Sequence, residues 1–340
     1  MDYKLEIFYS IVPDFISENY DFNQTSLIVD EINLVLSKFK LINEEWISDY
    51  TMSAKIVSFD SGLNYQGGLK PNLIGRKEDS LKFTVKAKIN IDNYVVNWLF
   101  GDSVTKVTER EELLKHLPYS ISDVFGDHIF EILVLSQISR PFSLKIREGI
   151  VFINSQRFRV NLPKILIFRD YLELINTLMY PDIQYLNFYD YFNWIIENKL
   201  FFLEIPKNIY QKALINLTYV IAEENDISKF IFKMRILELI YIEGDNHLSH
   251  QLETRIQCYL GEMKTFKKKI KKMYDFRSDF VHGTSLLVPF HKSAYENEAQ
   301  NKFNQGFYDA DAFSFLLIIS TLQKMYLENR TDLKFKVTLE

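Results

Sequence analysis

The chain has a single cysteine, Cys258, among its 340 residues. One thiol cannot form an intramolecular disulfide, and it excludes a cysteine-based zinc cluster, so the sequence fits a reducing compartment. Glycine and proline are also scarce, with 11 and 8 residues respectively. Few residues that interrupt helices and strands indicate a chain with dense secondary structure.

Long apolar runs and excess positive charge are lacking as well. No uninterrupted stretch approaches the roughly 20 apolar residues that a membrane helix needs. The amino terminus has no basic segment followed by an apolar run, which a secretion signal would show. The net charge of −5 excludes a wholly basic coat for nucleic acid, so any such contact must be a local patch. We expect a soluble, cytoplasmic protein without a membrane partner.

The first half of the chain predicts a mixed α and β domain, residues 1–163. Apolar residues alternate with polar ones from Leu81 to Ile91, the period of a strand with one wet face. Shorter strand signals occur at 5–12, 54–59 and twice within 142–160, with turns expected at 148–149 and 154–155. Helices are expected at 24–39, from Thr108 onward and at 122–139. These elements predict a small, largely antiparallel sheet with helices.

The second half, residues 164–340, predicts an all-helical region, so the fold class is α+β. Helices are expected at 208–224, 227–243, 249–262, 266–282 and 309–330. The last has Asp309 and Asp311 at its expected start, where the helix dipole favours negative charge, and its apolar residues indicate a central core helix. The polar segment 293–305 is predicted to be a loop.

One helix combines lysines, an arginine and a histidine. In the segment 266–282, Ile270, Met273, Tyr274 and Val281 are expected to form an inward stripe, with the lysines largely on the other side. Gly283 is suited to end this helix, because helix ends commonly need a left-handed backbone conformation. His282 then lies in the last turn, where unpaired carbonyl groups favour a protonated imidazole. Arg277 precedes it by five residues, about 140° around an ideal helix, so the two side chains converge only through the long arginine, a distorted helix end or a second protomer.

This pair of residue types suits RNA cleavage without a metal or a cofactor. The 2′-hydroxyl of RNA can attack its own adjacent phosphate, a histidine can move the proton, and a guanidinium can hold the phosphate oxygens. Basic residues upstream of the pair are candidates to attract the RNA backbone. They are Lys264, Lys267, Lys268, Lys269, Lys271 and Lys272.

The stretch resembles a known family signature. Tyr274, Asp275, Arg277, Ser278, Val281, His282 and Gly283 resemble the motif of the HEPN superfamily, in particular its ApeA-like branch. Residues 235–239 resemble the first long helix of that branch and residues 253–256 its second. The likeness covers about 206–328, and the nuclease core is expected at about 206–330.

The resemblance implies an endoribonuclease that acts as a homodimer, with tRNA or mRNA as substrate, and that serves as a toxin or abortive-infection effector in antiviral defence. By the same resemblance, Arg277 holds the scissile phosphate, His282 is the acid or base, and Ser278 occupies the polar position after the arginine. Tyr274 and Asp279, which lie within the motif, and His291 just beyond it are candidate supports of the cleft. Some members of the family do not cleave RNA and only bind nucleotides or partners.

Several alternatives stay open from the sequence. A lysine-rich helix face is also typical of a solvated surface, and Gly283 is explained by helix capping alone. A non-catalytic module that dimerises or binds a partner is the main rival function, and a nucleotide-binding regulator is another. His247 and His250 have metal-ligand spacing without a complete ligand set, and 62–69 has glycine spacing without the lysine of a phosphate loop, so we expect a helix start and a turn there. The amino-terminal domain is expected to sense a phage-derived trigger, bind RNA or hold the nuclease inactive.

Overall fold

The computed structural model describes residues 2–11, 22–39, 45–59, 78–94, 110–141, 146–158, 180–201, 205–223, 225–244, 247–261, 267–284 and 298–335. The chain divides into two compact units. Unit 1 comprises Met1–Gln137, Ser143–Ile167 and Asn187–Tyr189. Unit 2 comprises Ile138–Phe142, Phe168–Leu186 and Asp190–Glu340. The boundary predicted at 163–164 lies outside the described residues.

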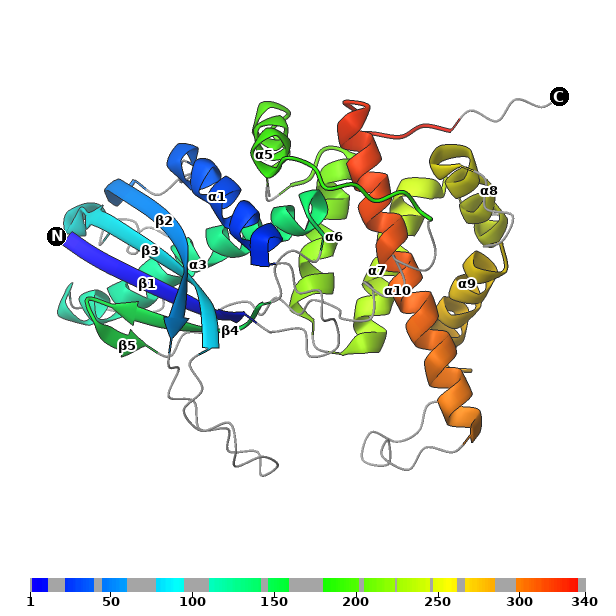
Figure 1. Cartoon of the computed structure of the whole chain (residues 1–340), viewed down its shortest axis with the longest axis horizontal. Coiled ribbons are helices and arrows are strands. Elements are labelled where there is room, and N and C mark those ends of the chain that lie inside the picture. Colours follow the sequence, from blue (N-terminus) through cyan, green and yellow to red (C-terminus); the bar gives the residue numbers. More distant parts are fainter. Residues whose placement is uncertain are drawn as a thin grey trace. The chain divides into compact units, whose positions relative to one another are not determined.

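Unit 1 contains an antiparallel sheet of five strands in the order β2-β3-β1-β4-β5 (Figure 1). The strands are β1 (Asp2–Ile11), β2 (Ile47–Phe59), β3 (Glu78–Ile89), β4 (Ile146–Ile153) and β5 (Gln156–Phe158). Every pairing between neighbouring strands is antiparallel. This confirms the sheet that the alternating apolar pattern predicted.

One face of the sheet forms the core of unit 1. Leu5 and Ile7 of β1 lie beside Phe83 and Val85 of β3 in register, and all four are buried. Helices α1 (Phe22–Lys38) and α3 (Arg110–Ser139) cover this face. Tyr50 of β2 contacts both, because its ring lies 5.8 Å from that of Phe125 in α3 and its hydroxyl donates to the carbonyl of Phe39, which follows α1.

Two predictions for unit 1 were wrong. The turn expected at Glu148 and Gly149 lies inside β4, where Gly149 pairs with Tyr9 of β1. The helix expected at 122–139 is helical and ends at Ser139 as predicted, but it does not start a new helix, because α3 runs unbroken from Arg110 through Pro118. A proline removes only one donor from a helix, and burial of Leu117 and Ile121 on either side holds this one together. The turn at Asn154 and Ser155 was correct, since both adopt positive φ, +47° and +70°, between β4 and β5. Thr108 and the glycines at 62–69 lie outside the described residues.

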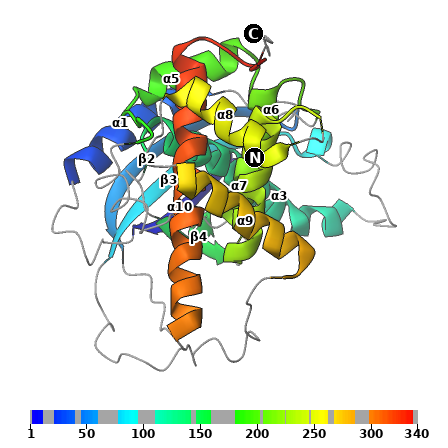
Figure 2. The same ribbon diagram turned by 90° about the vertical axis from the view of Figure 1, so that its right-hand side faces the viewer.

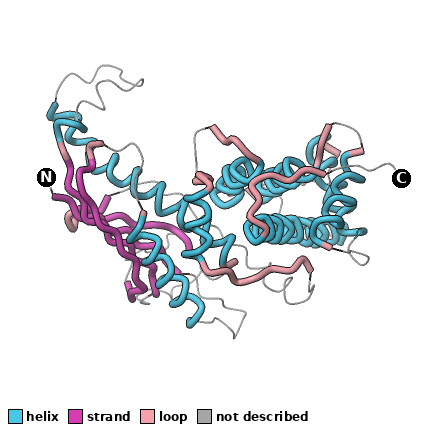
Figure 3. Tube along the Cα trace, turned by 90° about the horizontal axis from the view of Figure 1, so that it is seen from above, coloured by secondary structure: helices cyan, strands magenta, loops and turns pink. Residues whose placement is uncertain are grey.

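Unit 2 is helical, as the sequence predicted (Figure 3). Its helices include α5 (Phe188–Glu197, the first two residues of which belong to unit 1), α6 (Ile209–Ala222), α7 (Asp226–Tyr241), α8 (Leu248–Leu260), α9 (Lys267–His282) and α10 (Glu298–Leu327). α10 is buried along most of its length and runs past α7 and α9 (Figure 2), which confirms the expected central core helix. No helix in the described part of the chain is long and apolar enough to span a membrane.

The start of α10 corrects the sequence-based expectation. The helix begins at Glu298, so residues 298–305 are helical and not the predicted loop. Phe303 and Phe307 of this added turn pack on Phe276 of α9, with ring centroids 5.3 and 5.9 Å away. Asp311 therefore lies in the middle of the helix and not at its positive end. The sequence did not predict these helical turns because the segment is mostly polar and its few aromatic residues are widely spaced.

Candidate functional site

Helix α9 carries the motif and packs through one aromatic stripe. Ile270, Met273 and Phe276 are its buried residues. Four residues were predicted to face inward. The prediction is correct for Ile270 and Met273, but Tyr274 is only partly buried and Val281 is 53% exposed. Because α10 starts earlier than expected, its phenylalanines draw Phe276 inward and turn Val281 toward solvent. The last turn of α9 therefore presents an exposed surface.

Gly283 ends α9 as predicted. Its φ is +70°, in the left-handed region that glycine adopts without strain. The backbone N–H of Thr284 donates to the carbonyl of Asp279 at 2.9 Å, the hydrogen bond expected of a Schellman helix end. The Thr284 hydroxyl also donates to the Asp279 carboxylate at 2.9 Å. Asp279, a predicted cleft support, is thereby assigned to the helix cap.

His282 lies in the last turn of α9 and is exposed. Its imidazole makes no hydrogen bond or ion pair with any residue that the structure describes. Ser278 lies one turn earlier on the same side of the helix and is half-buried. An exposed imidazole with unoccupied nitrogens can accept or donate a proton to a bound molecule.

Arg277 is held by a carboxylate from another helix. Its Nε lies 2.9 Å from Oε1 of Glu238 in α7, and its Nη2 donates to Oε2 at 3.3 Å. Both side chains keep about a quarter of their surface exposed, 25% for Arg277 and 22% for Glu238. Arg277 also lies 5.8 Å from the ring centre of Tyr274, and partial burial raises the pKa of the Tyr274 hydroxyl while the guanidinium opposes that rise.

The pairing with Glu238 determines which part of the guanidinium can bind a ligand. The carboxylate occupies the edge formed by Nε and Nη2. The end formed by Nη1 and the second N–H of Nη2 has donors left for an anion, since arginine has five N–H groups. Glu238 therefore fixes the direction of Arg277 without using all of its donors.

The chain does not bring Arg277 and His282 into direct contact. No hydrogen bond joins them in the described part of the chain, and five residues of helix separate their directions by about 140°. Arg277 faces α7, whereas His282 faces solvent. A ligand that reaches both groups must therefore bind across the end of α9, or a second copy of the chain must contribute to the site.

The lysines of α9 differ in their surroundings. Lys268, Lys271 and Lys272 are exposed, and the exposed Lys267 pairs with the partly buried Glu253 of α8 at 2.9 Å. Lys269 lies 5.9 Å from the ring centre of Phe313, and Lys272 lies 5.7 Å from that of Phe276. The exposed lysines are the ones that can meet an anionic polymer. Lys264 and His291 lie outside the described residues.

The paired histidines of α8 fit a helix start. His247 is the residue before the first turn of α8, with φ of +53°, and His250 is an exposed residue of that turn. Among the residues described, no group of three or more histidine, cysteine, aspartate or glutamate side chains could hold a metal ion.

Two polar pairs in unit 2 escaped the sequence analysis. One is Arg277 with Glu238, whose partners are 39 positions apart. The other is Lys233 of α7 with Asp311 of α10, which are both buried and joined by a 2.6 Å hydrogen bond. Residues so far apart in sequence have no local spacing signal, although Glu238 belongs to the stretch that resembled the first family helix.

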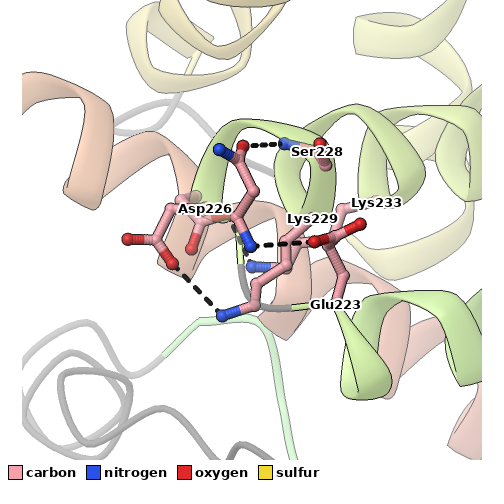
Figure 4. Close-up of polar contacts among 7 residues, drawn as sticks. Glu223, Asp226, Ser228, Lys229 and Lys233 are labelled. Carbon is pink, nitrogen blue, oxygen red and sulfur yellow. Dashed lines mark hydrogen bonds and ion pairs between the residues drawn. The ribbon is translucent and has the colours of Figure 1, made fainter. Parts of the chain in front are cut away.

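The amino-terminal turn of α7 leads to the buried Lys233 (Figure 4). Asn225 caps the helix by accepting a hydrogen bond from the backbone of Ser228 at 3.0 Å, and Lys229 pairs with Asp226 at 3.2 Å. Lys233 follows one turn later, and burial lowers its pKa to about 8 against the opposing effect of Asp311. The pair of Lys233 and Asp311 connects the middle of α7 to α10. Glu238 lies further along α7, in its last turn.

The chain has no significant match among family models, curated proteins or solved structures.

Proposed function

We propose that the chain is an endoribonuclease of the HEPN type that cleaves RNA without a metal, using Arg277 and His282. The observation that carries the proposal is the end of α9. An exposed imidazole stands beside the glycine cap, and an arginine of the same helix is oriented by Glu238 with donors to spare. The resemblance of residues 274–283 to the HEPN motif supports the same assignment.

The chemistry follows from what each group can do. The 2′-hydroxyl of the substrate attacks the adjacent phosphorus while the 5′-oxygen of the next nucleotide leaves. The 2′-hydroxyl loses a proton and the leaving 5′-oxygen gains one; His282 acts in one of these transfers, since an unperturbed imidazole titrates near neutral pH, and solvent water serves the other. The free end of the Arg277 guanidinium holds the phosphate oxygens as negative charge grows on them. The exposed Lys268 and Lys271 attract the RNA backbone.

A second copy of the chain completes this proposal. The two groups point about 140° apart on one helix, so a partner chain lets the arginine of one copy act with the histidine of the other. Val281, exposed in the same turn as His282, is an apolar residue that such a contact would cover. In the cell, this activity fits a toxin or abortive-infection effector against phage.

The test compares the wild-type chain with His282→Ala. Because His282 is exposed, the substitution is expected to leave the fold intact while RNA cleavage in EDTA and toxicity on expression both fall, cleavage by at least about 100-fold. His250→Ala is the matched control, since this histidine is exposed on α8. Equal cleavage by His282→Ala and the wild type would overturn the proposal.

The Arg277–Glu238 pair also favours a second candidate function. An arginine held by a carboxylate from a neighbouring helix is a common structural contact, so the helical unit can serve as a non-catalytic dimerisation or partner-binding module. This candidate predicts that His282→Ala keeps the cellular phenotype. It also predicts that Arg277→Ala affects the phenotype only as far as it destabilises the fold.

A further inference from the structure

The sheet of unit 1 has a second face with a composition unlike its core. Strand alternation places on this face the side chains that point away from α1 and α3, and we refer to it as the outer face. Among the side chains that the structure describes, it carries six basic residues, namely Lys4, Lys55, Lys82, Lys86, Lys88 and Arg157. The described side chains also include three acidic residues, Asp2, Glu6 and Asp49, so these nine charges sum to +3. The whole chain carries −5, which makes this face a local basic surface.

The register aligns the basic residues across neighbouring strands. Lys55 of β2 lies beside Lys82 of β3, and Lys4 of β1 lies beside Lys86 of β3. Like charges directly opposite each other on a sheet are destabilising. An anion bound to this surface would relieve the repulsion between these lysines.

Glu6 is the anion that the chain supplies at the centre of the face. It pairs with Lys82 and, at 2.9 Å, with Lys4. Partial burial raises the pKa of Glu6, but the hydrogen bonds and charges of Lys82 and Lys4 outweigh it and bring the pKa below its usual value. Lys88 has only a 3.9 Å contact with Asp49, and both side chains are about two-thirds exposed, 65% and 67%. Such an open pair contributes little in water.

The rest of the face suits a polymer of bases and phosphates. A hollow of about 390 Å³ opens there, and its charged lining consists of three lysines and two aspartates, Lys4, Lys86, Lys88, Asp2 and Asp49, with Thr51 and Asn154 beside them. Phe152 of β4 is only half-buried, packs edge-on against Phe8 with 5.6 Å between ring centres, and lies beside Arg157. Lysines bind phosphates, and a partly exposed aromatic ring on a sheet can stack on a base.

We propose that the outer face of the unit 1 sheet binds single-stranded RNA. Its charge complements the phosphate backbone, and alternate residues of β3 place Lys86 and Lys88 about 7 Å apart along the strand. The choice of RNA as the anionic polymer rests on the proposed ribonuclease function. Binding by this face does not require His282, so the two proposals can fail separately.

The experiment measures binding of a single-stranded uridine oligonucleotide to the full chain that carries His282→Ala, in which proposed cleavage is removed. The variant Lys86→Gln/Lys88→Gln is expected to bind on the order of tenfold more weakly, and its slope of log affinity against log salt is expected to fall by about 1.4. Both lysines are exposed, so the fold is expected to persist. Lys207→Gln/Lys212→Gln, which removes the same charge from exposed positions in unit 2, is the control and is expected to bind as the parent does.

Further arms identify the ligand. Lys86→Arg/Lys88→Arg keeps the charge and is expected to restore binding, whereas Phe152→Leu is expected to weaken it about fivefold without changing the salt slope. Inorganic polyphosphate, which has the charge but no bases, is expected to compete poorly. Equal weakening by the Lys207/Lys212 control, or equal binding of polyphosphate, would overturn the proposal. Binding of phosphatidylserine vesicles in place of RNA would overturn it as well.

Discussion

At the scale of single residues, the direction of Arg277 depends on Glu238. The carboxylate holds the Nε and Nη2 edge, so the remaining N–H donors face away from α7. The sequence identified Arg277 and His282 but gave the arginine no partner, and neither aspartate that flanks Arg277 in the motif pairs with it in the described structure. Asp279 caps the helix with Thr284, and Asp275 is exposed.

Glu238→Gln tests this positioning role. The amide keeps the shape of the side chain but loses its charge, so the free energy of unfolding is expected to fall by about 1 kcal/mol in urea titrations. At saturating RNA, the cleavage rate is expected to fall on the order of tenfold because Arg277 is no longer fixed, while RNA affinity stays within about twofold. Asp275→Asn is the control, since it removes an exposed carboxylate from α9 itself. A loss of stability with an unchanged cleavage rate would limit Glu238 to a structural role.

At the scale of elements, the buried pair of Lys233 and Asp311 connects α7 to α10. Lys233 is fully buried and Asp311 nearly so. Lys233→Met leaves the Asp311 carboxylate buried without its partner, so we expect a loss of about 3–5 kcal/mol in the free energy of unfolding. Lys233→Met/Asp311→Leu removes both charges and is expected to be as stable as the wild type or more stable. Urea titrations of the two variants measure the difference, and equal losses in both would contradict this account.

The same pair makes stability depend on pH. Burial lowers the pKa of Lys233 from 10.5 to about 8, so between these values the unfolded chain binds more protons than the folded one. Stability from this group is therefore fully present above pH 10.5 and is lost as the pH falls through 8. The free energy of unfolding of the wild type, minus that of Lys233→Met/Asp311→Leu, is expected to rise between pH 8 and pH 10. A difference that stays constant or falls over this pH range would show that burial does not lower the pKa of Lys233.

The same elements show how far the sequence could predict the fold. Periodic apolar residues located α9 to within one residue of its start, and the alternation in β3 identified the buried face of the sheet. Local signals failed where a distant partner decided the outcome. The first turns of α10 are helical because Phe303 and Phe307 pack on Phe276 of α9. Pro118 is accommodated inside α3 because its neighbours Leu117 and Ile121 are buried. The partners of Arg277 and Lys233 lie on other helices and have no signature in local spacing.

At the scale of the whole molecule, a chain of net charge −5 carries two local basic surfaces, each within its own unit. One is the exposed part of α9 with Lys268 and Lys271, and the other is the outer face of the sheet. The two proposals assign RNA binding to these patches, and a local patch does not require the whole surface to be basic. The family resemblance covers the region of α9 and does not extend to the sheet, whose basic face follows from the strand register.

The most direct test of the central claim is the chemistry of the RNA ends after cleavage in EDTA. The proposed attack by the 2′-hydroxyl predicts that the wild type leaves 2′,3′-cyclic phosphates, and that an RNA with a 2′-deoxy nucleotide at the cut position stays intact. His282→Ala and Arg277→Ala are expected to give no product above background, while His250→Ala gives the wild-type pattern. Products with 3′-hydroxyl ends, or cyclic phosphates formed equally well by His282→Ala, would contradict the account.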